Sequence, residues 1–174
     1  MVISEFVVNF APYLTIAMNF DVEEIEELSG NAASIYSVTM EGEETTLLEQ
    51  FFEENAEYET ELNELLNKLY EMGKEIGCRR DYFKHDEGSP GDGVSVLKSG
   101  RLRLYCLYVD STIVCFGSGG YKPPEIRAYQ ENPELNKKVE QMKTIAKRIN
   151  KAIIEKDIEI KDGKLNIHYW DYED

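Results

Sequence analysis

The sequence predicts an α+β fold, with a small twisted antiparallel sheet, two helices on one face and a further helix towards the C-terminus. Three short runs of alternating apolar residues between residues 94 and 118 indicate the sheet, and the turn pairs Ser99-Gly100 and Asp110-Ser111 separate them. Apolar residues spaced three or four apart on both sides of this meander indicate the helices. A chain of 174 residues is long enough for a single domain with its own core.

The first forty residues have the alternation of strands. Residues 1–33 are expected to form an N-terminal strand extension, with strand-like runs on both sides of Ala11-Pro12 and a short acidic helical turn that ends at Gly30. Residues 34–40 (SIYSVTM) alternate in the same way and predict a strand of the main sheet.

Two helices are expected between residues 43 and 77. Thr45 or Thr46 is suited to cap the first helix, with Glu49 as its partner in a capping box, and this helix is expected to break near Asn55. The second helix carries a stripe of leucine, methionine and isoleucine at helical spacing, which is typical of a face that packs on a core.

The rest of the chain surrounds the meander. A loop rich in glycine and proline is expected between Tyr82 and Val94, and the last part of residues 121–154 has the apolar periodicity of a helix. Residues 155–174 are expected to form a hairpin-like tail that turns at Asp162-Gly163.

Composition restricts the protein class. No apolar run is long enough to span a bilayer, and the N-terminus lacks the basic segment of a signal peptide. Cys78, Cys106 and Cys115 have no CxxC spacing, which favours three reduced thiols in a cytoplasmic protein. With two histidines and no histidine–cysteine cluster, no metal site and no cofactor are expected.

The net charge of −15 is unevenly distributed along the chain. Residues 1–78 carry 2 basic and 18 acidic side chains, whereas residues 79–154 carry 14 basic and 9 acidic ones. Two interpretations stay open at this point: solvated faces of opposite sign, or a basic patch with a function that acidic segments balance.

The segment RLRLYCLYVD presents its side chains to alternate faces of a strand. Leu102, Leu104 and Cys106 belong to the expected core face, so Arg101, Arg103 and Tyr105 are expected together on the opposite face. Two arginines and a tyrosine on one sheet face can bind phosphates and stack on bases. The alternative is a face of water-solvated arginines.

Two neighbouring segments add candidate residues. GSGGYK ends in Tyr121 and Lys122, and its glycines either let the backbone approach a ligand or simply form a turn. Arg79-Arg80 and Lys84-His85 flank the loop before the meander, where His85 is suited to acid–base chemistry near neutral pH or is a surface residue without a role.

Three segments, LLEQFFEEN, LLNKLYEMGKEIG and SGRLRLYCLYVDSTIVCFGSGGYK, resemble the RelE/HigB superfamily of toxin–antitoxin toxins, in particular its phage-derived HigB-like branch. The resemblance covers residues 34–154. It implies metal-independent mRNA cleavage, often on the ribosome, by attack of the RNA 2′-OH on the adjacent phosphate, and neutralisation by a helix-turn-helix antitoxin. The implied catalytic residues are Arg101, Arg103, Tyr105, Lys122 and His85, and the implied RNA-binding residues are Lys84, Arg79, Arg80 and Tyr121.

The chain is acidic, whereas RNA binding depends on positive charge, and two other hypotheses stay open. The first is a non-catalytic RelE-like interaction module, whose acidic helices and sheet edge bind an antitoxin or another regulator. The second is a small-molecule or phosphate-binding protein that uses residues 117–122. Homo-oligomerisation is left open.

Overall fold

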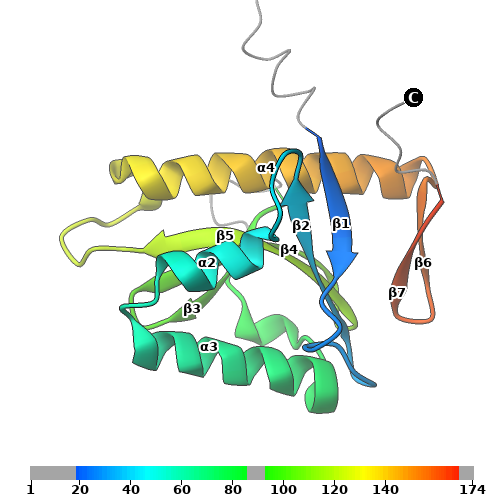
Figure 1. Ribbon diagram of the computed structural model, residues 1–174, viewed down its shortest axis with the longest axis horizontal. Coiled ribbons are helices and arrows are strands. Elements are labelled where there is room, and N and C mark those ends of the chain that lie inside the picture. Colours follow the sequence, from blue (N-terminus) through cyan, green and yellow to red (C-terminus); the bar gives the residue numbers. More distant parts are fainter. Residues whose placement is uncertain (1–18, 86–92, 169–174) are drawn as a thin grey trace, which may run out of the picture.

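A five-stranded sheet lies at the centre of the protein, shown in Figure 1 as a computed structural model that describes residues 19–85 and 93–168. The spatial order of its strands is β1-β2-β5-β4-β3, and β6 and β7 form a separate two-stranded sheet. The bounds are β1 Phe20–Glu24, β2 Ser34–Met40, β3 Ser95–Ser99, β4 Leu102–Asp110, β5 Ile113–Tyr121, β6 Ile158–Lys161 and β7 Lys164–Ile167. The strand-like runs predicted before Met18 lie outside the described residues.

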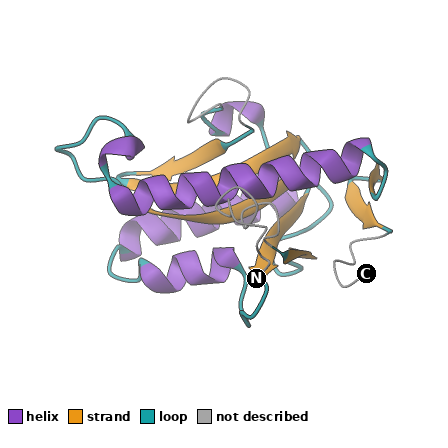
Figure 2. Ribbon diagram, turned by 90° about the horizontal axis from the view of Figure 1, so that it is seen from above, coloured by secondary structure: helices purple, strands orange, loops and turns teal. Residues whose placement is uncertain are grey.

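Helices cover both faces of this sheet, as Figures 1 and 2 show. Helices α2 and α3 pack on one face, and the long helix α4 crosses the other. The bounds are α2 Leu47–Glu54, α3 Glu59–Glu71 and α4 Pro133–Ile154, with short helical turns at Met72–Ile76, Arg80–Tyr82 and Tyr129–Glu131. The α+β fold class is therefore confirmed. The acidic segment before Gly30 forms a single turn, in which the backbone N–H groups of Leu28 and Ser29 donate to the carbonyl oxygen of Ile25.

The sheet is mixed, which corrects the expectation of a purely antiparallel one. Strand β2 pairs in parallel with β5, from Ser34↔Ile113 to Ser37↔Phe116, while the other neighbours in this sheet pair antiparallel. Parallel neighbours need a long crossover between them, and the chain supplies one by passing through α2, α3, β3 and β4 before β5.

The expected turns and caps are present. Thr46 and Glu49 form a capping box at the start of α2, and Asn55 ends this helix. The β3–β4 hairpin turns at Gly100, which has a φ of 56°. The β6–β7 hairpin turns at Asp162 and Gly163, both with positive φ, so the predicted C-terminal hairpin is confirmed within the described residues.

Two hydrophobic clusters lie on opposite faces of the sheet. One joins α4 to Tyr105, Leu107 and Cys115, and the other joins α2 and α3 to Cys106 and Phe116. Because alternate residues of β4 and β5 enter different clusters, both strands are buried on both faces.

The three thiols are free, as predicted, and all three are buried. Burial raises the pKa of Cys78 and of Cys115 to about 12, and it raises that of Cys106 well above its ordinary value. The part of the chain that the structure describes contains no helix both long and apolar enough to cross a membrane.

Candidate functional site

The sheet face predicted to be open is covered by α4. Tyr105 is fully buried and Arg103 is 9% exposed, whereas Arg101 lies exposed in the β3–β4 turn. The ring of Tyr105 lies edge-on to that of Tyr129, with 6.5 Å between the ring centroids. The expectation that Arg101, Arg103 and Tyr105 share an open face is therefore wrong, because the apolar stripe of α4 packs on the residues that follow Arg103.

Four of the predicted residues do lie together at one end of the sheet. Arg103 Nη1 donates hydrogen bonds to the carbonyl oxygens of Gly100 and Leu102, at 2.9 and 3.1 Å. The backbone N–H of Lys122 donates to the carbonyl of Arg101 at 2.8 Å, which places Tyr121 and Lys122 beside that turn.

The side chains of Tyr121 and Lys122 also have partners within this end of the fold. Lys122 Nζ donates to the carbonyl oxygen of Arg127 at 2.7 Å. Tyr121 stacks on Tyr58, from the α2–α3 connection, with ring centroids 4.6 Å apart. The side chains of Tyr121 and Lys122, like that of Arg103, are therefore held by contacts within the protein.

The glycines of GSGGYK belong to strand β5, where they allow close packing and do not form an open ligand loop. A Cβ at Gly117 would lie 2.6 Å from Met142 Sδ of α4, and one at Gly119 would lie 1.8 Å from the carbonyl oxygen of Arg103. The segment therefore needs glycine for contact with α4 and β4.

A cleft of about 330 Å³ lies near the other end of β4 and contains two of the predicted residues, Arg80 and His85. The guanidinium carbon of Arg80 lies 5.7 Å from the ring centroid of Tyr108, and the ring of His85 meets that of Tyr108 edge-on at 5.1 Å. The cleft is lined by Arg80, His85, Gly93, Ser95, Leu107, Tyr108, Val109, Asn150, Ile153 and Ile160.

Hydrogen bonds fix the polar side chains of this cleft. His85 Nδ1 lies 2.9 Å from Ser95 Oγ, and His85 Nε2 lies 2.9 Å from the carbonyl oxygen of Arg80, to which it donates. The Tyr108 hydroxyl donates to the carbonyl oxygen of Cys78 at 2.8 Å. Burial raises the pKa of Tyr108, so its phenol stays protonated at neutral pH. Both ring nitrogens of His85 have partners, which suits an orienting role better than proton transfer.

The predicted site is thus divided between two places. Arg103 and Tyr108 are five residues apart on one strand, which corresponds to about 17 Å. A single phosphate that contacts Arg103 at its end of the sheet therefore does not reach His85, which lies beside Tyr108.

The two remaining predicted residues are exposed near the cleft without lining it. Arg79 pairs with Asp81 at 3.0 Å and lies over the ring of Tyr82. Lys84 makes an isolated backbone bridge to Val96, and its side chain is exposed.

Sequence reasoning did not identify Tyr108, Ser95 and Asn150 as lining residues. Tyr108 shares a strand face with Leu104 and Cys106, so the alternation assigned it to the core. Its position near the end of the strand, two residues before Asp110, was the available signal for a partly exposed residue.

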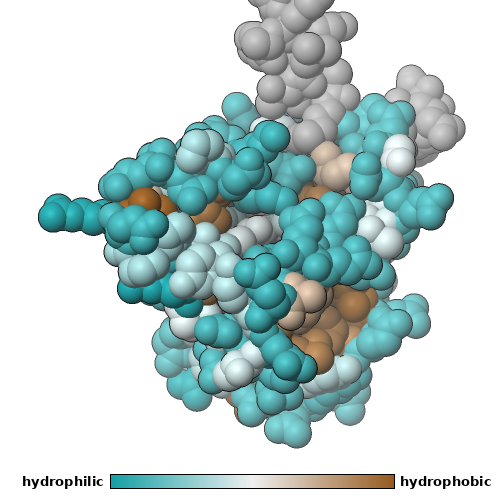
Figure 3. All heavy atoms as spheres, turned by 60° about the vertical axis from the view of Figure 1, so that its left-hand side comes forward, coloured by the Kyte–Doolittle hydropathy of each residue, from teal (hydrophilic) through white to brown (hydrophobic). Residues whose placement is uncertain are grey.

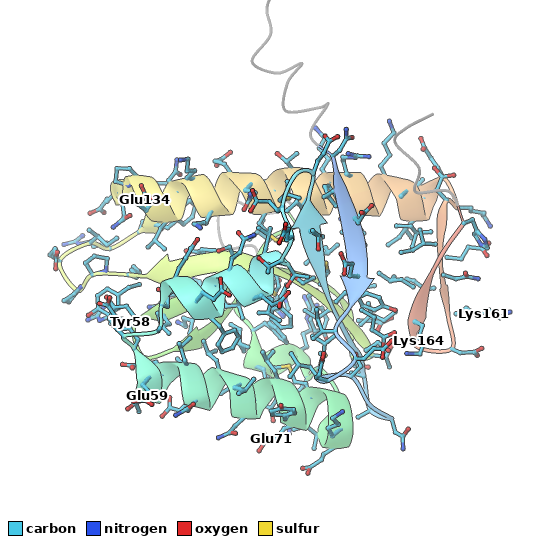
Figure 4. All side chains as sticks on the ribbon, in the orientation of Figure 1. Tyr58, Glu59, Glu71, Glu134, Lys161 and Lys164 are labelled. Carbon is cyan, nitrogen blue, oxygen red and sulfur yellow. The ribbon has the colours of Figure 1, made fainter. Side chains whose placement is uncertain are left out.

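The outer surface of α2 and α3 is a second candidate site. Residues 47–76 carry 9 acidic and 2 basic side chains, whereas α4 (133–154), across the sheet, carries 6 basic and 2 acidic ones. Figure 4 marks Glu59 and Glu71 towards the two ends of α3 and Glu134 at the start of α4.

Apolar side chains accompany this acidic surface. Phe52 of α2 and Leu66 of α3 are only partly buried, and Tyr70 of α3 is 40% exposed. Figure 3 shows an apolar hollow framed by hydrophilic side chains on the side of the molecule that α2 and α3 cover. We call the outer surface of residues 47–76 the acidic face.

The described residues contain no group of three or more histidine, cysteine, aspartate or glutamate side chains arranged to hold a metal ion. No family model, no curated protein and no solved structure matches the chain.

Proposed function

We propose that the protein is a non-catalytic interaction module whose acidic face binds a basic, amphipathic segment of a partner protein. The observation that carries this proposal is the separation of charge by the sheet: acidic side chains dominate the α2–α3 layer and basic ones the α4 layer. A partner segment with lysine or arginine on one side and apolar residues on the other would match the acidic side chains together with Phe52 and Leu66. The helix-turn-helix antitoxin implied by the RelE/HigB resemblance is one partner of this class, because DNA-binding proteins carry positive surfaces.

Metal-independent mRNA cleavage has less support from the geometry. It needs cationic groups and an acid–base pair around one phosphate. Tyr105 is buried, Arg103 and Lys122 donate to backbone carbonyls, and His85 lies in a separate cleft.

Binding to the acidic face can be tested with a labelled helical peptide of lysine and leucine and the full-length protein, by fluorescence anisotropy. The double substitution Glu53→Lys and Glu71→Lys places opposite charge on exposed positions of α2 and α3 and changes the net charge from −15 to −11. It is expected to weaken binding by roughly tenfold, as the loss of several screened charge interactions requires.

A matched control separates site binding from general charge attraction. Glu140→Lys with Glu155→Lys makes the same change in net charge at exposed positions of α4 and its C-cap. This variant is expected to bind the peptide within about twofold of the unmodified protein. Equal weakening by both variants would refute the acidic face as the site.

Expression of the protein alone in a bacterium tests the enzymatic alternative. The interaction module is expected to leave growth and translation unchanged. Growth arrest that is abolished by Arg101→Ala or Lys122→Ala would overturn the proposal in favour of mRNA cleavage.

A further inference from the structure

The last part of α4 has the charge opposite to that of the acidic face. Residues 141–154 contain no acidic side chain and four basic ones, which are Lys143, Lys147, Arg148 and Lys151. The acidic residues of α4 come earlier, and one of them, Glu140, pairs with Lys143 at 3.0 Å. The two residues that follow the helix, Glu155 and Lys156, are exposed and of opposite charge. The net positive charge of this layer therefore belongs to the end of α4.

An apolar side chain accompanies the exposed lysines of this region. Lys147, Lys151 and Ile154 are spaced by four and three residues, so they lie on one side of the helix. This side is turned away from the sheet, because both lysines are exposed and Ile154 is 79% exposed. We call these three residues the basic stripe. The chain thus carries a basic, amphipathic helical surface of the kind that the acidic face is proposed to bind.

The acidic face carries the complementary groups. Glu53 of α2 and Glu71 of α3 are exposed and can attract the lysines of a basic stripe. Tyr70 and Ile76, beside Glu71 at the end of α3, are 40% and 45% exposed. Contact between these apolar side chains and Ile154 of another copy would remove both from water.

We propose that a second copy of this chain is a partner of the acidic face, which it contacts with its basic stripe. This inference rests on the proposed function and names a binding partner for the same surface. The sheet separates the two surfaces within one copy, as Figure 1 shows, so two copies cannot form both contacts with each other. The contact is therefore heterologous, and each added copy presents one further acidic face or basic stripe to the next.

The net charge of −15 does not prevent this contact at physiological ionic strength. Charges are screened over about 8 Å in about 0.15 M salt. A helix with its side chains is about 10 Å across, so the far layers of the two copies lie beyond this length. The facing groups then determine the sign of the interaction. Because the contact is small and exposed, we expect a dissociation constant of about 100 µM.

Sedimentation velocity of the full-length protein measures this association. The average mass is expected to rise between about 10 µM and 1 mM protein in about 0.15 M salt. Lys147→Glu with Lys151→Glu reverses the basic stripe, changes the net charge from −15 to −19, and is expected to weaken association about tenfold. Ile154→Ala removes the apolar contact and is expected to weaken it about fivefold without a change in net charge.

A matched control separates this contact from the effect of net charge. Arg127→Glu with Lys161→Glu also gives −19, at exposed positions outside α4 and outside residues 47–76. It is expected to associate within about twofold of the unmodified protein. Circular dichroism checks that all variants are folded.

A mixing experiment tests that the two surfaces meet each other. The Glu53→Lys and Glu71→Lys variant keeps its basic stripe, and the Lys147→Glu and Lys151→Glu variant keeps its acidic face. Each variant alone is expected to remain monomeric at about 100 µM. An equimolar mixture is expected to form complexes, because an intact acidic face then meets an intact basic stripe. Carbodiimide cross-linking of labelled with unlabelled protein is expected to join residues 47–76 of one copy to Lys147 or Lys151 of another.

Three results would overturn this inference. They are a monomeric protein up to about 1 mM, equal association of the stripe variant and its charge-matched control, and a mixture of the two surface variants that does not form complexes. A monomeric protein whose acidic face still binds the lysine–leucine peptide would leave the proposed function intact. The proposed function fails separately if that peptide binds the Glu53→Lys and Glu71→Lys variant as tightly as the unmodified protein.

Discussion

Replacing Ile149 by alanine is expected to destabilise the protein by about 3 kcal/mol. Ile149 is fully buried on the side of α4 that packs on the sheet, in the same cluster as Tyr105. The substitution tests whether α4 is a fixed layer over that sheet face, which is the reason for rejecting Tyr105 as a site residue.

The magnitude follows from the atoms removed. Alanine lacks three carbon atoms of isoleucine, and about 0.8 kcal/mol for each buried methylene gives about 2.4 kcal/mol. The residual cavity adds to this cost, because the sheet on one side and the helix backbone on the other limit collapse. For a chain of this length the melting temperature is expected to fall by about 6–12 °C.

Urea unfolding followed by circular dichroism measures the difference, and Ile154→Ala is the matched control. Ile154 belongs to the same helix but is 79% exposed, so its substitution is expected to change the free energy of unfolding by less than about 0.5 kcal/mol. Equal losses in the two variants would mean that α4 is not held on the sheet, and the face that contains Tyr105 would again be a candidate site.

Three further predictions concern other parts of the fold. Gly119→Ala places a Cβ 1.8 Å from the carbonyl oxygen of Arg103, so the β4–β5 ladder must shift and we expect a loss above about 3 kcal/mol in urea unfolding; a loss below about 1 kcal/mol would contradict this geometry. Thr46→Ala removes the capping box of α2 and is expected to cost about 1 kcal/mol by the same measurement. Cys78 and Cys115, whose pKa values rise from 9.0 to about 12, are expected to resist a thiol reagent at pH 8 until the protein unfolds. The thiols of the unfolded chain ionise at a lower pH than those of the folded protein. The free energy of unfolding is therefore expected to keep its full thiol contribution below about pH 9 and to decline as the pH rises from 9 towards 12. Rapid labelling of the folded protein at pH 8 would disprove the burial of these thiols.

The sequence predicted those features that depend on neighbouring residues. The cap at Thr46 and Glu49 and the turn at Asp162 and Gly163 involve residues within one turn of each other, so their chemistry is visible in the sequence. The parallel pairing of β2 with β5 was not predicted, because alternation assigns the faces of a strand and not its neighbour.

The candidate site was predicted less well, for a reason that β4 makes clear. Arg101 and Arg103 suggested one open face, yet the residues that follow are apolar on both faces, with Tyr105 and Leu107 on one side and Cys106 on the other. Strands that are apolar on both faces lie between two covering layers, and this signal predicts that helices occupy both sides. The two arginines precede the part of β4 that α4 covers. The guanidinium of Arg103 donates to the carbonyl oxygens of Gly100 and Leu102, at the β3–β4 turn.

Closure of both sheet faces determines where this protein can bind another molecule. The interior of the sheet offers no contact surface, because Tyr105 and Phe116, which face opposite layers, are both fully buried. Binding is then restricted to the outer surfaces of the helices and to sheet edges. The acidic face is an outer helical surface of this kind, with 9 acidic and 2 basic side chains in residues 47–76. A basic peptide is therefore expected to bind the acidic face more tightly than an acidic peptide of the same length, and equal affinity for this face would contradict the assignment.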